Sequence, residues 1–210
     1  MPHMTARQAA VQALLKVDGE GGYSNLVLNE QLKKAQLSPE DTAFASRLFY
    51  GTLERKLTLD HIIGVYSKKP VHKLTPAVAE ILRMSLYQLA FLDNVPDSAA
   101  VNEGVKLTRT MKAASASGFV NAVLRNVAGH LGEVDYPSQE ADPAGFLSVM
   151  YSYPRWIAEM YICDYGFDFA WEMFSYHKPE AYTSVRVNRL KTDRVALERK
   201  LEGRGLSFVP

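Results

Sequence analysis

Few side chains in this sequence have the types and spacings that perform catalysis. The single cysteine, Cys163, stands beside Asp164 and has no basic neighbour in sequence to activate its thiol, so the pattern indicates an inert residue. Asp60 and His61 could form half of a catalytic triad, but no nucleophile is marked out and a pair on a helix surface is the favoured interpretation. The histidines are scattered and lack metal-ligand spacing; they are His3, His61, His72, His130 and His177. The sequence therefore predicts no catalytic residue and no metal site in this chain.

Glycines also fail to form a cofactor-binding loop. A phosphate or dinucleotide loop needs glycines between a strand and a helix. Gly203 and Gly205 follow a predicted helix, whereas Gly19, Gly21 and Gly22 have no strand before them. We therefore expect no cofactor site in this chain.

Basic residues suggest binding to RNA. Lys106, Arg109 and Lys112 recur every three residues along one predicted helix, where neighbours at this spacing could reach one RNA backbone. Further basic residues gather at helix ends and turns: Lys33, Lys34, Arg55, Lys56, Lys68, Lys69 and Lys73. A second set on and after a predicted C-terminal strand could face single-stranded bases: Arg186, Arg189, Lys191 and Arg194.

The overall composition is that of a folded protein and gives this signal little extra support. Hydrophobic residues make up 47% and charged residues 22% of the 210, with a formal net charge of +1. Net charge is +4 over residues 1–130, −7 over 131–176 and +4 over 177–210. A solubilising helix surface is thus the alternative explanation of the basic residues. The longest uncharged stretches, 113–124 and 143–154, are shorter than the roughly 20 residues of a membrane span, and no secretory signal begins the chain, so we expect a cytoplasmic protein without a membrane partner.

Helices joined by short turns account for the first 130 residues. Thr5 is a typical N-cap for the first helix, Ser38-Pro39 begins the third, and Thr58 is expected to cap the fourth. The helix over residues 77–92 is apolar around most of its circumference, which is typical of a central, buried helix. Seven helices and no alternating strand pattern predict a mainly α fold, with a helical bundle of about 125 residues.

The residue composition changes after residue 130. Proline, glycine and acidic residues between 132 and 145 predict a linker over 131–150. Ser152 is expected to cap a helix over 154–164, which is followed by a helix over 167–176. Residues 182–188 and 206–209 read as strands around a helix over 193–202 that Thr192 caps. Because two strands and one helix bury little apolar surface, we expect residues 151–210 to be the first part of a small, incomplete α+β subdomain that is RRM-like, cut from a longer protein.

Several runs of residues resemble the NusB-like helical domain across residues 5–130. These runs are 7–14 (RQAAVQAL), 82–89 (LRMSLYQL), 99–105 (AAVNEGV) and 118–125 (GFVNAVLR). The tail resembles the linker and RNA-binding subdomain of the bacterial small-subunit rRNA cytosine-5 methyltransferases of the RsmB or Sun family, through residues 151–156 (YSYPRW) and 184–192 (SVRVNRLKT). One departure is that antitermination factors with this fold carry an arginine-rich first helix, whereas only Arg7 stands here.

The resemblance implies a function for the longer protein. It implies an enzyme that uses S-adenosylmethionine and a thiolate attacking C6 of cytosine, with those residues in a catalytic domain that lies beyond this fragment, which is itself non-catalytic. The implied partner is small-subunit rRNA, with a ribosomal or transcription-factor protein as a further partner. The residues expected to contact RNA are Lys106, Arg109, Lys112, Arg125, Arg186, Arg189 and Lys191. Two alternatives stay open: an adaptor of the antitermination or protein-binding kind, and a scaffold that stabilises the catalytic domain.

Overall fold

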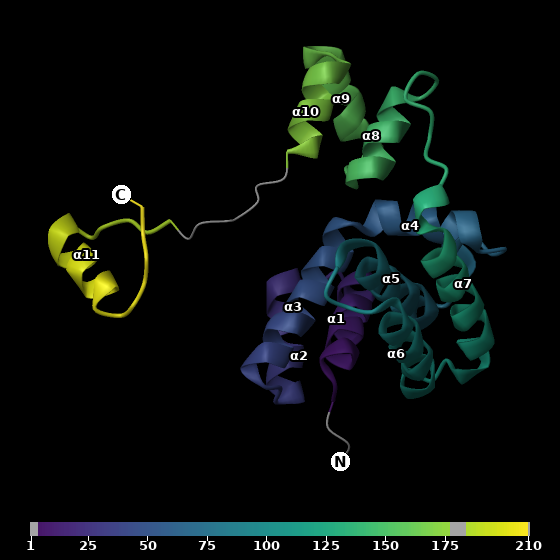
Figure 1. The fold of residues 1–210 in the computed structure, drawn as a ribbon, viewed down its shortest axis with the longest axis horizontal. Helices are drawn as coiled ribbons and strands as arrows, with labels where there is room; N and C mark the ends of the chain where they lie inside the picture. The colour runs from purple at the N-terminus through teal and green to yellow at the C-terminus, as the bar shows by residue number, and fades with distance from the viewer. Residues whose placement is uncertain (1–3, 177–183, 210) are drawn as a thin grey trace. The chain divides into compact units, whose positions relative to one another are not determined.

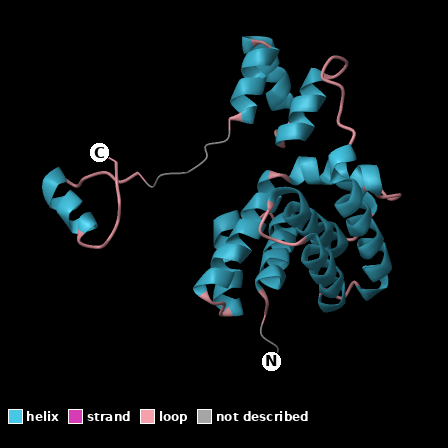
Figure 2. Cartoon of the chain, in the orientation of Figure 1, coloured by secondary structure: helices cyan, strands magenta, loops and turns pink. Residues whose placement is uncertain are grey.

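The structure, a computed structural model, describes residues 4–176 and 184–209, and over these ranges it is helical without a strand (Figure 1, Figure 2). The chain divides into two units, Met1–Ser175 and Tyr176–Pro210. The α-helices of the first unit are α1 (Ala6–Glu20), α2 (Ser24–Ala35), α3 (Pro39–Glu54), α4 (Lys56–Tyr66), α5 (Pro76–Phe91), α6 (Asp97–Thr110), α7 (Ser117–His130), α8 (Pro143–Tyr151), α9 (Arg155–Tyr165) and α10 (Phe167–Ser175). Short 3-10 turns are η1 (Val71–Lys73), η2 (Ala114–Ala116) and η3 (Leu131–Glu133). The predicted mainly α fold, with seven helices before residue 131, is confirmed.

Helix α5 forms the centre of the bundle. Every residue from Val78 to Gln88 is buried, and α5 contacts α1, α3, α4, α6 and α7. Its apolar side chains join one core with residues of α1, α3, α4, α6 and α7. The expectation that the most apolar helix is the central one is therefore confirmed.

Two of the predicted helix starts are confirmed in detail. Thr5 accepts a hydrogen bond from the backbone N–H of Gln8, and its own N–H donates to Gln8 Oε1 at 2.8 Å, which makes a capping box. Ser38 caps α3 by accepting from the N–H of Asp41 at 3.1 Å, with Pro39 at the first helical position. Local sequence is sufficient to begin these helices.

A cluster of charges surrounds the buried pair Arg83 and Glu80 of α5. Arg83 donates twice to Asp60, at 2.6 and 2.9 Å, and also donates to Glu80 and to Asp18. Burial raises the pKa of the Glu80 carboxyl. Partial burial opposes ionisation of Asp18, but its hydrogen bond with Lys56 and the nearby positive charges hold its pKa below the ordinary value. Arg83 thus joins α1, α4 and α5 at one point.

Helices α3 and α5 approach closely at Gly51. A Cβ atom built at Gly51 would run into the ring of Tyr87, a buried side chain of α5. Glycine is therefore required at this point of α3 by the space that Tyr87 occupies. By contrast, a Cβ at Gly64 of α4 would meet no atom within 4 Å.

Helices α8, α9 and α10 pack into a second apolar cluster within the first unit. Ala144, Leu147, Ala158, Ala170 and Phe174 are buried there. Asp142 caps α8 by accepting from the N–H of Gly145, and it binds the guanidinium of Arg155 through both carboxylate oxygens at 2.8 Å. The later part of the segment expected as a linker, 131–150, is therefore folded as α8.

The start of α4 differs from the prediction and involves α8. The helix begins at Lys56, so Thr58 lies inside it and does not cap it. Ser152, expected to begin α9, instead ends α8 with a left-handed backbone (φ 63°), and its Oγ accepts hydrogen bonds from the N–H groups of Leu57 and Thr58. Thr58 Oγ1 in turn donates to the carbonyl of Val149 at 2.6 Å. Both predicted caps were wrong because the two residues bond to each other's helices across some 90 positions of sequence.

The second unit does not contain the predicted strands. Residues 184–188 and 206–209 have no regular secondary structure and pair with no described strand, and 182–183 lie outside the described residues. A strand is defined by its ladder of hydrogen bonds with another strand, which a β-branched pattern does not supply by itself. Helix α11 (Arg194–Glu202) is present, but Asp193 caps it, not Thr192: Asp193 Oδ1 accepts from the N–H of Ala196 at 2.8 Å. The expected α+β, RRM-like subdomain is thus not supported.

Candidate nucleic-acid interface

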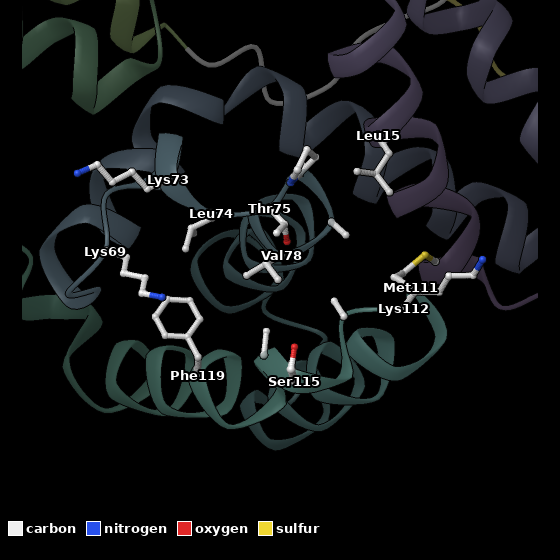
Figure 3. Close-up of a pocket in the computed structure, with 14 residues that line it drawn as sticks. Leu15, Lys69, Lys73, Leu74, Thr75, Val78, Met111, Lys112, Ser115 and Phe119 are labelled. Atoms are coloured by element: carbon white, nitrogen blue, oxygen red, sulfur yellow. The ribbon is translucent and has the colours of Figure 1, made fainter.

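The first unit has a cleft where the ends of several helices meet. Its volume is about 640 Å³, and it is bounded by the start of α5, the end of α6, the start of α7 and the turn η1. Figure 3 shows Leu74, Thr75 and Val78 at its middle, with Lys69 and Lys73 on one side and Lys112 on the other. We call it the lysine cleft after these three lysines.

All charged side chains that line the lysine cleft are positive. Its lining contains Lys69, Lys73 and Lys112 and no carboxylate. None of these lysines forms an ion pair with another residue that the structure describes. The side chain of Thr75, at the N-cap of α5, accepts no capping hydrogen bond, and the first turn of α5 has no acidic residue, so the positive end of this helix faces the cleft uncompensated. Such a surface attracts anions.

Apolar side chains form the rest of the lining. Leu15 of α1, Val78 of α5 and Phe119 of α7 line the cleft together with Met111 at the end of α6. A polyanion that carries flat apolar groups, such as RNA, matches a lining of this mixed character.

Of the three basic residues predicted along α6, the structure brings one to the cleft. The helix ends at Thr110, and Lys112 follows with a left-handed backbone (φ 56°), so the regular spacing expected through residue 112 was wrong. Lys106 and Arg109 are exposed on α6 and do not line the cleft. Lys106 also forms an ion pair with Glu103 at 2.7 Å.

The remaining predicted residues lie elsewhere. Arg125 is exposed on α7 and donates from Nε to Asn121 Oδ1 at 3.1 Å. In the second unit, Arg186 and Arg189 are exposed and line a depression together with Val187 and Asn188. Lys191 is exposed in the turn that follows, where its N–H donates to the carbonyl of Asn188. Arg186 lies in a segment without regular secondary structure and Arg189 and Lys191 lie in a turn, not on the predicted sheet.

Lys69 and Lys73 were seen in the sequence as basic residues near a helix end but were not selected as RNA contacts. Lys69 lies two residues before η1 and Lys73 is the last residue of η1, between α4 and α5, and both reach the cleft because that turn brings the chain to the start of α5. The sequence shows that Pro70 precedes a short turn and that Thr75-Pro76 starts a helix. It does not show that this turn and this helix start lie next to the end of α6, because that contact depends on the tertiary fold.

Asp60 and His61, the pair considered in the sequence as half of a triad, each bind another part of the fold. Asp60 is engaged by Arg83, and His61 Nε2 lies 2.7 Å from the carbonyl oxygen of Asp135, so this pair does not form part of a triad. Over residues 4–176 and 184–209, no group of three or more His, Cys, Asp or Glu side chains is placed to hold a metal ion. Across the same residues, no helix has both the length and the apolar character that crossing a membrane requires.

Comparisons with known proteins give a consistent picture. Residues 4–129 match the model of the NusB family. The chain is 33% identical over 208 residues to the "Probable ribosomal RNA small subunit methyltransferase B" of Bacillus subtilis (strain 168), covering 98% of this chain and 45% of that protein. It is 33% identical over 132 residues to the transcription antitermination protein NusB of Bacillus licheniformis, covering 62% of this chain and 99% of that protein.

Solved structures agree on the fold. The structure of T. maritima NusB covers 61% of this chain with a TM-score of 0.56 at 22% identity, and 92% of that protein is matched. The structure named PH0851 covers 100% of this chain with a TM-score of 0.66 at 19% identity, although only 46% of that protein is matched. The chain thus spans less than half the length of the methyltransferase B relative from B. subtilis.

Proposed function

Since this chain belongs to the NusB family, we propose that it is the RNA-binding region of an rRNA cytosine-5 methyltransferase and presents small-subunit rRNA to a methyltransferase domain. Similarity to methyltransferase B along almost the whole chain supports this reading. A solved relative by fold is described as the antitermination factors NusB and NusE in complex with dsRNA, which supports RNA as the ligand of the helical bundle. A cytoplasmic location is part of this proposal, since the expected substrate is rRNA.

The lysine cleft is the observation that carries the proposal. Three lysines without described ion-pair partners, no carboxylate in the lining and the positive end of α5 make it a site for RNA phosphates. Lys112 therefore contacts phosphate together with Lys69 and Lys73. Lys106, Arg109 and Arg125 extend the contact along the exposed surfaces of α6 and α7. Arg186, Arg189 and Lys191 form a second contact near the base that is modified.

The proposal divides the chain by task. Residues 1–130 bind RNA, residues 131–150 connect, with α8 as the folded part of that connection, and residues 151–210 lead toward the methyltransferase domain. The described residues do not fit an S-adenosylmethionine site, because they include no strand and hence no strand-to-helix loop of the kind that holds nucleotide cofactors. The cofactor and the methyl transfer are therefore assigned to the longer protein, and no chemical step is assigned to this chain.

The test is binding of the 210-residue chain to a small-subunit rRNA fragment by filter retention across a salt series. We expect a plot of log affinity against log salt concentration with a slope of several units, because each neutralised phosphate releases counterions. The triple variant Lys69→Gln/Lys73→Gln/Lys112→Gln should lower both affinity and slope. A control of equal charge, Lys33→Gln/Lys34→Gln/Arg47→Gln, removes exposed cations of α2 and α3 and should retain most of both. Absence of binding at low salt, or equal effects of the two triple variants, would contradict the proposal.

A second candidate, a protein-binding adaptor, is favoured by one observation: the NusB of the solved complex is bound to a protein, NusE, as well as to RNA. Pull-down of a partner protein that survives ribonuclease treatment, together with no RNA binding in the salt series, would favour the adaptor. Loss of the partner on ribonuclease treatment would favour RNA.

A further inference from the structure

Aromatic rings form a continuous row on helices α9 and α10 and on Tyr153, which precedes α9. Tyr153 stacks on Phe174 with ring centroids 4.3 Å apart, and Tyr161 meets the edge of Phe174 at 5.6 Å. The row continues from Tyr161 to Tyr165 at 5.8 Å and from Tyr165 to Phe169 at 5.0 Å. We call these five residues the aromatic row.

The aromatic row is buried at Phe174 and open to solvent toward α9 and the start of α10. Phe174 is buried, whereas Tyr165 is 62% exposed and Phe169 is 49% exposed. Two adjoining aromatic rings exposed to this degree are unusual on a surface that binds nothing, since apolar area left in water forgoes the gain of burial.

Carboxylates accompany the exposed rings. Asp164 directly precedes the exposed Tyr165 in α9, and Glu172 follows the exposed Phe169 by three residues in α10, so Phe169 and Glu172 share a helix face. Neither carboxylate forms an ion pair with any residue that the structure describes. Both also lie in the last turn of their helix, where the macrodipole disfavours negative charge. Local helix stability therefore does not account for them.

The charge of this region selects the kind of partner. Residues 151–176 contain one basic residue, Arg155, and four acidic residues. Arg155 is already held by Asp142 and Glu159. RNA and anionic lipid would meet net repulsion here. An arginine or lysine side chain, however, can stack its cation on an aromatic face while a neighbouring carboxylate binds its N–H groups.

From this arrangement we propose that the aromatic row of α9 and α10 is a docking surface for an extended, arginine- or lysine-rich segment of a partner protein. Cationic side chains of the segment lie over the rings of Tyr165 and Phe169 and pair with Asp164 and Glu172. This surface is separate from the lysine cleft, and the proposal stands whether or not the cleft binds RNA.

The experiment measures binding of fluorescein-labelled peptides of about 15 residues to the full 210-residue chain by fluorescence anisotropy. The probes are an arginine-rich peptide, a glutamate-rich peptide and a uridine-rich single-stranded RNA. Two double variants test the surface: Tyr165→Ala/Phe169→Ala removes the rings, and Asp164→Asn/Glu172→Gln removes the charges. The matched control, Tyr23→Ala/Glu54→Gln, alters an exposed ring at the start of α2 and an acid in the last turn of α3.

We expect the arginine-rich peptide to bind, the glutamate-rich peptide not to bind, and each surface variant to weaken peptide binding at least about tenfold, roughly 1.4 kcal/mol. The control should change affinity less than about twofold. Circular dichroism and thermal unfolding confirm that the variants are folded, which is expected because the substituted side chains are exposed. Failure of the arginine-rich peptide to bind, equal binding by the surface variants, or RNA binding that the ring variant abolishes would each overturn the proposal.

Discussion

The hydroxyl of Ser152 caps helix α4 by accepting a hydrogen bond from the backbone N–H of Leu57 at 2.9 Å. The same oxygen accepts from the N–H of Thr58 at 3.1 Å. Arg55, at the N-cap position, provides no side-chain hydrogen bond to the first turn. A residue that ends α8 therefore supplies the N-cap function that the local sequence of α4 lacks.

Replacing Ser152 should weaken the contact between the end of α8 and the first turn of α4. Ser152→Ala removes the oxygen and should lower the free energy of unfolding by about 1–2 kcal/mol, measured by urea denaturation. Ser152→Gly also loses the oxygen but relaxes the left-handed backbone, so its loss should be smaller. Ser98→Ala, at an exposed serine of α6, is the control and should change stability little. Equal stability of Ser152→Ala and the control would contradict the capping role.

The buried charge cluster predicts a large asymmetry between its members. Arg83→Met leaves the carboxylate of Glu80 buried without its main partner and should lower the free energy of unfolding by about 3–5 kcal/mol. Glu80→Gln should cost far less, since Arg83 keeps its two hydrogen bonds to Asp60. Chemical denaturation at neutral pH compares the two, and similar losses would show that Arg83 does not compensate Glu80.

The same cluster predicts how stability depends on pH. Burial raises the pKa of Glu80, so the folded state retains this proton above about pH 4.3, the ordinary value for glutamate. The contribution of Glu80 to stability therefore falls as pH rises through that window. The stability of Glu80→Gln relative to the unaltered chain should increase between about pH 4 and 7. Asp18, whose pKa is lowered, gives the opposite trend: Asp18→Asn should lose its relative disadvantage as pH falls below about 4.

The contact at Gly51 predicts opposite effects of one substitution at two glycines. Gly51→Ala places a methyl group against the ring of Tyr87 and should cost about 1–3 kcal/mol. Gly64→Ala, in open space on α4, should stabilise the chain by about 0.5–1 kcal/mol through its better helix propensity. Thermal unfolding of both variants checks the pair. Adding Tyr87→Leu to Gly51→Ala should recover part of the loss, and no recovery would rule out the ring as its cause.

Single substitutions at the lysine cleft separate its members from basic residues elsewhere. If RNA phosphate lies against Lys112, then Lys112→Gln should reduce the salt slope of rRNA binding by about 0.7–0.9. Lys106→Gln should reduce it less, because Glu103 already neutralises part of that charge. Filter retention across the salt series measures both, and a larger effect at Lys106 would move the phosphate path from the cleft to the exposed face of α6.

The sequence predicted correctly those features that depend on residues close to one another in the chain. The caps Thr5 and Ser38 and the central position of α5 follow from local residue types and apolar periodicity. The cap of α4 could not be predicted, because its donor and acceptor lie about 95 residues apart. The strand expected over 182–188 failed at described residues for the related reason that β-branched alternation does not provide a pairing partner.

The residues of the lysine cleft could likewise be predicted only in part from the sequence. Basic residues at helix ends were visible, but which of them face one cleft depends on where α5, α6 and η1 meet. Lys112 was selected for a helical spacing that the structure does not have, and it lines the cleft because α6 ends before it. Lys69 and Lys73, without any helical periodicity, required the fold.

Helix α4 connects α8 at its first turn with the lysine cleft beyond its last residue. Its first turn is hydrogen-bonded to Ser152 of α8, and just beyond its last residue, Tyr66, the chain turns into the segment that carries Lys69 and Lys73. Eleven residues at 1.5 Å each give a rod of about 16 Å. One short helix thus connects the end of α8 with the segment that forms one wall of the lysine cleft.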